Sequence, residues 1–448
     1  MNRAKYILII LLIFVFLIVM TIISFVYFGI TKPPTVKAHT YLELKLRGEI
    51  KEISPPDFIA VKLFGHTPLT MNGIWTNIRK AKADHRIDSI LLRIDRLECG
   101  WGKVNEIREA LLDFRKSGKK VISYLEEGVD FDKEYYLATA SDKIYFHPLG
   151  FLVINGLGGY YPFLKKALDK LGIKGEFEHI EEYKTAYDIF TEEGFTEANR
   201  EMTESILDDY FSHYLDTIAK ARSKTKEEMK KIIDYGFYQG KKALEAGLVD
   251  ELLFEDQLRK KLKGDREKLE TISYSRYLKI KPSSVGLETG QKIALIYGVG
   301  AIHTGEGFYR AIGSSTFARW IRKARKDSSI KAIVFRVDSP GGSAVGSNII
   351  WREVELAKKE KPFIVSMSDL AGSGGYWISV AADQIFAQPQ TLTASIGVIF
   401  GKFNFAGFYQ KIGISAGKIK RGEEADIWST FRGFTPEERK MIRKEISW

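Results

Sequence analysis

The chain carries one pattern of short apolar runs and glycine turns twice. The first copy reads Ile90-Leu-Leu-Arg-Ile-Asp95, and the second reads Ile333-Val-Phe-Arg-Val-Asp338. Further matches follow at a nearly constant offset, as far as Gly194-Phe-Thr-Glu197 and Gly433-Phe-Thr-Pro436. A repeat this long with few gaps predicts two copies of one domain. It therefore restricts the chain to folds that can be built twice side by side.

Within each copy, β-branched runs alternate with amphipathic helical patterns, which is typical of buried strands packed between helices. We therefore predict an α/β fold of tandem duplicated domains built from repeated ββα units. In the first copy the expected elements are strands at Ile87–Ile94, Val121–Leu125 and Lys143–Phe146, and helices at Val104–Ser117 and Lys133–Ala140. The predicted domains are the first copy over residues 32–280, a linker over 281–291 and the second copy over 292–448.

The first 31 residues differ from the rest. Tyr6 to Ile30 is an uncharged apolar run, long enough to cross a bilayer as a helix. Arg3 and Lys5 precede it, so the N-terminus is expected in the cytoplasm and the domains on the exported side. A cleavable signal peptide would have a shorter apolar core and a small-residue cleavage site. Residues 1–31 thus predict a cytoplasmic stub and a transmembrane signal anchor.

Charge and cysteine content exclude some classes of function. The net charge is +11, but basic residues are mixed with acidic ones and no nucleic-acid-binding module is present. A solvated surface that can face anionic lipid accounts for the charge. Cys99 is the single cysteine, so the chain can form no intrachain disulfide. The second copy stops short of a segment that the first copy carries through Asp250, so we expect either an incomplete chain or a neighbour that caps it.

The candidate nucleophile is Ser373, within Ala371-Gly-Ser-Gly-Gly-Tyr376 between an apolar strand and a helical pattern. A serine at such a turn points outward, and the Gly374 N–H at the helix start could stabilise an oxyanion. A second glycine turn, Asp338-Ser-Pro-Gly-Gly-Ser343, also follows a strand. The first copy has Asp95-Arg-Leu-Glu-Cys-Gly100 there and Asp132 opposite Ser373, as expected of a copy without the nucleophile.

A serine hydroxyl needs a base. No histidine follows Ser373 or matches between the copies, although a triad through His303 stays open. Lys184, in Glu182-Tyr-Lys-Thr-Ala186, lies in the first copy opposite Ala425 of the second. A buried lysine can act as a base once its pKa falls toward 7–8 from about 10.4. Glu181 and Glu182 would raise that pKa, so we expect both to point away.

These motifs, together with Leu392-Thr-Ala-Ser-Ile-Gly397 and the membrane segment, resemble signal peptide peptidase A in its long, duplicated form. That family consists of membrane-bound serine peptidases of the Clp protease/crotonase superfamily. The resemblance implies Ser373 as nucleophile, Lys184 as general base and Ser395 as a hydrogen-bond partner of the lysine. It implies an oxyanion hole from Gly374 and from Gly341 or Gly342, without saying which of those two donates.

The resemblance implies a Ser/Lys endopeptidase that degrades signal peptides and other apolar peptides at the membrane. It implies no metal or organic cofactor, a ring-like homo-oligomer, contact with the lipid bilayer and no nucleic-acid partner. Two other classes stay open. One is an acyl-CoA enzyme of the crotonase type, and the other is a catalytically inactive membrane scaffold of the same fold.

Overall fold

The computed structural model describes residues 6, 11–18, 20–21, 34–54, 67–287 and 290–447. Most of the predicted membrane segment, Tyr6 to Ile30, lies outside these ranges. Among the helices that are described, none is both long and apolar enough to cross a bilayer. The fold of the remaining chain is mixed α/β with parallel sheets, as the sequence predicts.

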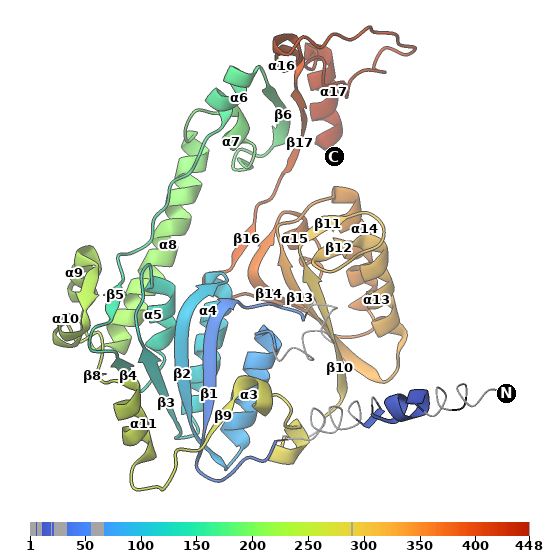
Figure 1. The fold of residues 1–448 in the computed structure, drawn as a ribbon. Coiled ribbons are helices and arrows are strands. Elements are labelled where there is room, and N and C mark those ends of the chain that lie inside the picture. The colour runs from blue at the N-terminus through green and yellow to red at the C-terminus, as the bar shows by residue number, and fades with distance from the viewer. Residues whose placement is uncertain are drawn as a thin grey trace.

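The first copy is built on a parallel sheet that buries its own apolar core (Figure 1). In spatial order its strands are β8 (Glu251–Leu252), β4 (Lys143–Phe146), β3 (Lys120–Leu125), β2 (Ile87–Glu98), β1 (Thr40–Glu49) and β9 (Thr271–Ser273). The helices that follow β1, β2 and β3 are α3 (Met71–Ala83), α4 (Trp101–Arg115) and α5 (Asp132–Ala138). The five elements predicted for this copy all form, with ends that shift by a few residues.

The second copy repeats this order with a second core. Its strands are β15 (Gln384–Phe386), β14 (Phe363–Gly372), β13 (Ile330–Ser339) and β10 (Lys292–Val299), and β16 (Leu392–Ala394) also pairs with β14. The corresponding helices are α13 (Ser314–Lys326), α14 (Ala344–Ala357) and α15 (Gly374–Trp377). The matched order of the two sheets is what a duplicated domain would give.

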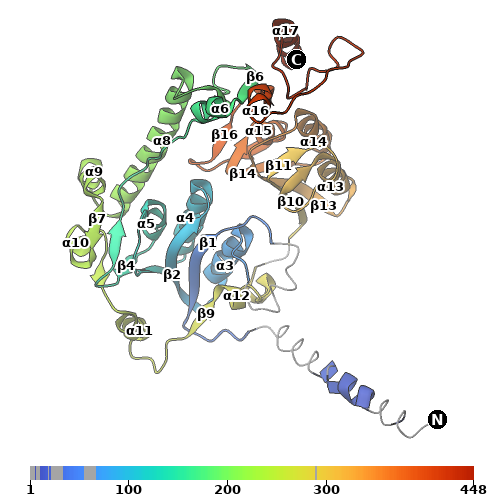
Figure 2. The ribbon, with the colours of Figure 1, turned by 45° about the horizontal axis from the view of Figure 1, so that its top comes forward.

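A further layer joins the two copies away from the sheets. Strand β6 (Lys174–Ile180) of the first copy pairs antiparallel with β17 (Val398–Asn404) of the second. Figure 1 shows this pair at the top of the molecule, and Figure 2 shows the long helix α8 (Glu197–Ala221) leading away from it. The elements around the pair are α6 (Lys165–Leu171), α7 (Asp188–Thr191), α16 (Ala406–Lys411) and α17 (Pro436–Ile446). Segments far apart in sequence therefore share one small sheet.

The Gly-Phe-Thr motif begins a helix in both copies. Thr196 caps α8 by accepting a hydrogen bond from the Asn199 N–H, and Thr435 caps α17 by accepting one from Glu438. The remaining elements are β5 (Phe151–Val153), α9 (Lys226–Tyr235), β7 (Phe237–Gln239), α10 (Gly240–Glu245), α11 (Glu255–Lys263), α12 (Tyr274–Tyr277), η1 (Pro282–Val285), β11 (Ala301–His303) and β12 (Ala311–Gly313). The short helix η1 lies within the predicted linker.

Candidate active site

Ser373 lies at the turn between β14 and α15, where the sequence predicts it. Its backbone has φ 50° and ψ −116°, a conformation that side chains other than glycine rarely adopt. The Ser373 N–H donates to the Ala394 carbonyl at 2.7 Å, and its carbonyl accepts from the Trp377 N–H at 2.9 Å. Strain of this kind persists only where the surroundings impose it, and it is frequent at functional sites. The half-buried serine is thus held at a strained turn.

The Pro-Gly-Gly turn lies directly against this serine. A Cβ at Gly341 would come within 2.5 Å of the Gly374 nitrogen and 2.8 Å of the Ser373 Cβ, so only glycine fits. The Gly341 N–H donates to Ser339 Oγ at 3.1 Å. The described part of the chain holds no partner for the Gly342 N–H. Of the two glycines that the sequence left open, Gly342 therefore has the amide free to meet a substrate.

Lys184 follows strand β6 and is brought to the same region from the first copy. Its ammonium donates to the Ser395 carbonyl at 2.5 Å and to Ser395 Oγ at 3.1 Å. The residue is only 6% exposed, and burial lowers the pKa of its amine below the ordinary value. Glu181 and Glu182 are both exposed, as expected for side chains that point away from the lysine. Lys184 and Ser373 do not hydrogen-bond each other in this structure.

Ser395 lies between β16 and β17, on the second-copy side of the site. Ala394 and Ser395 both have positive φ, 67° and 53°, so the chain turns sharply here. A Cβ at Gly372, the residue before Ser373, would lie 3.8 Å from the Ser395 Cβ. Ser395 therefore lies between the lysine that it binds and the end of strand β14, directly before Ser373. The ladder from β6 to β17 makes this possible, because it pairs Ile180 with Val398.

The other candidate nucleophiles and bases have different surroundings. The His303 ring hydrogen-bonds the Glu306 carbonyl at 2.8 Å, within its own loop. Burial raises the pKa of the Cys99 thiol to about 12, so this cysteine is not a reactive thiolate at neutral pH. Asp132, the counterpart of Ser373, accepts hydrogen bonds from the Tyr214 hydroxyl and the Gly156 N–H. Within the residues described, no group of side chains is arranged to hold a metal ion.

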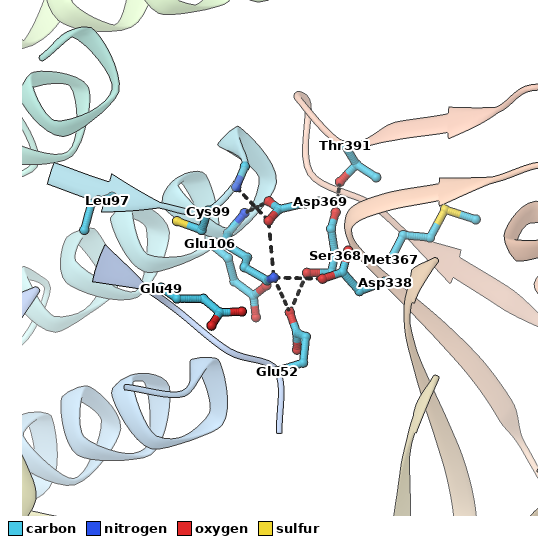
Figure 3. Close-up of polar contacts among 12 residues, drawn as sticks. Glu49, Glu52, Leu97, Cys99, Glu106, Asp338, Met367, Ser368, Asp369 and Thr391 are labelled. Atoms are coloured by element: carbon cyan, nitrogen blue, oxygen red, sulfur yellow. Dashed lines mark hydrogen bonds and ion pairs between the residues drawn. The ribbon is translucent and has the colours of Figure 1, made fainter. Parts of the chain in front are cut away.

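A buried ionic cluster beside the glycine turn was not anticipated from the sequence (Figure 3). The Lys103 ammonium of α4 lies 2.7 Å from Asp338 and 3.3 Å from Asp369, and 3.8 Å from Glu52. Arg336 pairs with Glu52 at 3.0 Å. A weak signal existed, since Asp369 interrupts an apolar strand. A strand pattern could not show, however, that Asp369 pairs with Lys103 of the other copy.

A family model described as peptidase family S49 matches residues 113–269 and 355–447. The chain belongs to peptidase family S49. The resemblance drawn from the sequence motifs is thereby confirmed, since S49 is a family of serine peptidases of the Clp protease/crotonase type.

Similar proteins in this family carry protease names. "Serine protease SPPA, chloroplastic" of Arabidopsis thaliana is 36% identical over 91% of this chain and 61% of that protein. "Protease 4" of Salmonella typhi is 34% identical over 83% and 62%, and "Protease 4" of Haemophilus influenzae is 32% identical over 78% and 59%. The chain thus spans less than two thirds of the length of these S49 relatives.

Proposed function

We propose that this S49 chain is a serine endopeptidase with a Ser/Lys dyad assembled from both copies of a duplicated domain. The observation that carries the proposal is the placement of Lys184. A lysine of the first copy is buried against Ser395, next to the turn that holds Ser373 in the second copy. Burial favours the neutral amine that a general base requires.

In the proposed reaction, neutral Lys184 accepts the proton of the Ser373 hydroxyl as its oxygen attacks a peptide carbonyl. The N–H groups of Gly342 and Gly374 hold the oxyanion. Collapse of the tetrahedral intermediate releases the amine product, which takes a proton from Lys184, and water then hydrolyses the acyl-enzyme. Ser395 keeps the lysine oriented throughout. Hydrogen bonds of a catalytic pair are often formed only with substrate bound, so the missing Ser373–Lys184 bond fits this scheme.

The proposed substrates are extended apolar peptides, including signal peptides left in the membrane. The glycine turns let a peptide backbone approach closely, and the apolar run at residues 6–30 would hold the enzyme at the bilayer, with its domains on the exported side. A ring-like homo-oligomer belongs to the same proposal. Membership in S49 and the protease names of its relatives favour this function over an acyl-CoA enzyme.

The test is cleavage of a fluorogenic apolar peptide by the full chain in detergent, between pH 6 and 10. We expect Ser373→Ala and Lys184→Ala to be inactive while folded. Lys80 is the control, because burial lowers the pKa of its amine to about 8. It donates to the backbone carbonyls of Tyr277 and Ile280, away from Ser373. Lys80→Arg keeps these donors and should keep the activity and the pH profile.

Besides cleavage that survives Ser373→Ala, two other results would contradict the proposal. Activity in Lys184→Ala would place the base elsewhere, and His303 would then be substituted next. A folded wild-type chain without activity on any apolar peptide would favour the scaffold function instead.

A further inference from the structure

The two copies meet through charged side chains buried beside the candidate active site. Lys103 of the first copy and Arg336 of the second are 7% and 6% exposed, and Glu52 is 4% exposed. Arg336 donates to both carboxylate oxygens of Glu52 and to Glu106. Buried ion pairs often add little stability, because desolvation offsets their attraction. Their presence at this interface therefore needs an explanation other than stability alone.

The position of Asp369 indicates what the cluster does. Its carboxylate accepts hydrogen bonds from the Gly100 N–H and the Lys103 N–H, both at 2.8 Å, at the start of helix α4. Gly100 has no side chain to cap this helix. A residue of the second copy therefore caps a helix of the first, where a carboxylate is favoured by the helix dipole. In the second copy, helix α14 is capped by its own Ser343.

The Lys103 ammonium contacts both segments that form the candidate active site. Asp369 belongs to β14, the strand that ends at the nucleophile turn. Asp338 directly precedes Ser339, whose hydroxyl accepts the Gly341 N–H in the glycine turn. Lys103 contacts the carboxylates of both Asp338 and Asp369, which Figure 3 labels. Movement of this one side chain would change the separation between the serine and the amides opposite it.

The close packing of α4 against β14 also indicates that the first copy positions this strand. A Cβ at Gly100 would come within 2.5 Å of the Asp369 carboxyl carbon, and one at Gly102 within 2.8 Å of the Ser368 carbonyl oxygen. The backbone of β14 therefore approaches α4 as closely as glycine allows. The repeat supplies a contrast, because Arg93, the counterpart of Arg336, pairs with Glu43 and Glu255 of its own copy.

We propose that Asp369 and Lys103 are positioning residues, through which the first copy fixes the nucleophile strand and the oxyanion turn of the second. The first copy, which lacks the serine, would thus act as the support of the active site as well as the source of its base. This inference rests on the proposed function, because it takes Ser373 as the nucleophile.

The test measures kcat, KM and the rate at which a fluorophosphonate labels Ser373, using the full chain. We expect Asp369→Asn to lower kcat and labelling on the order of 10–100-fold, since a displacement of reacting groups by about 1 Å can cost about 100-fold. KM should stay unchanged, because the substrate surfaces are intact. Lys103→Met should behave similarly, and Lys103→Arg should recover part of the lost kcat.

Two controls separate positioning from loss of stability. Arg93→Gln removes two part-buried ion pairs of the first copy, to Glu43 and Glu255, and it should lower the melting temperature without lowering kcat. If Asp369→Asn does not fold, the same measurements on Gly100→Ala test the proposal instead, because this variant displaces Asp369 without removing a charge. Its steric control is Gly290→Ala, where an added Cβ meets nothing within 4 Å.

Wild-type kcat in folded Asp369→Asn or folded Gly100→Ala would overturn the inference. So would an equal fall in kcat for Arg93→Gln, since the effect would then follow stability. Failure of the proposed function gives a different result, namely peptide cleavage that survives Ser373→Ala.

Discussion

At the scale of single residues, the strained backbone of Ser373 has a measurable consequence. A non-glycine residue held in a region that glycine prefers costs about 1–3 kcal/mol. Ser373→Gly relieves this strain, against an entropic cost of about 0.5–1 kcal/mol for the added glycine. We therefore expect Ser373→Gly to unfold at higher urea than Ser373→Ala, although both are inactive. Equal midpoints would show that the turn is not strained.

The pKa of Lys184 gives a second prediction at this scale. Because burial lowers the pKa of this amine, the neutral form is populated at lower pH than for a free lysine. Activity should rise as pH increases through that lowered pKa and level off above it. A profile of kcat/KM against pH, which reports the free enzyme, measures it. If kcat/KM instead rises with the pKa of an exposed lysine, Lys184 is not the base.

At the scale of elements, the turn that leads into β17 packs closely against the first copy beside Lys184. Gly397 has φ +123°, and a Cβ there would come within 2.5 Å of the Ile180 carbonyl and 3.1 Å of the Lys184 Cβ. Gly397→Ala should therefore displace the lysine and lower kcat by about tenfold or more. Gly413→Ala is the matched control, because Gly413 also has positive φ, +75°, but nothing within 4 Å of the added Cβ.

The elements also show how far the sequence could predict this molecule. Strand β4 forms over Lys143–Phe146 as expected, because its apolar run and flanking turns are local signals. The helical pattern that follows Ser373 in the sequence gives only α15, which ends at Trp377. The chain must turn early there, because the Asp383 carboxylate accepts the Phe363 N–H and sets β15 beside β14. Local patterns locate such elements but not their ends.

Some parts of the candidate site are likewise predictable from local sequence, and others are not. Ser373 and the glycine turns stand out, because their composition is unusual within a few residues. The pairing of β6 with β17 and the capping of α4 by Asp369 join residues that lie far apart in the chain, so no local pattern predicts them. The comparison of the two copies does not by itself identify Lys184 as the candidate base. The family resemblance is needed as well.

At the scale of the whole molecule, the copies are joined by more than the chain between them. The ladder of β6 and β17, the contact of Asp369 with α4, and ion pairs from Arg439 and Arg443 of α17 to Glu178 all cross the boundary. We expect a chain cut by an inserted protease site at residues 286–290 to elute as one species and to cleave peptide as before. Separation of the halves on gel filtration would contradict this.

The ladder between β6 and β17 also bears on how the protein is made. Lys184 leaves the ribosome long before Ser395 and its strand, by on the order of tens of seconds at about 5–20 residues per second. The first copy can fold around its own core during that interval, but the lysine has no serine beside it. The proposed active site is therefore complete only after β17 has been made. Until then, a nascent chain of this design lacks the strand pairing that joins the proposed base to the proposed nucleophile.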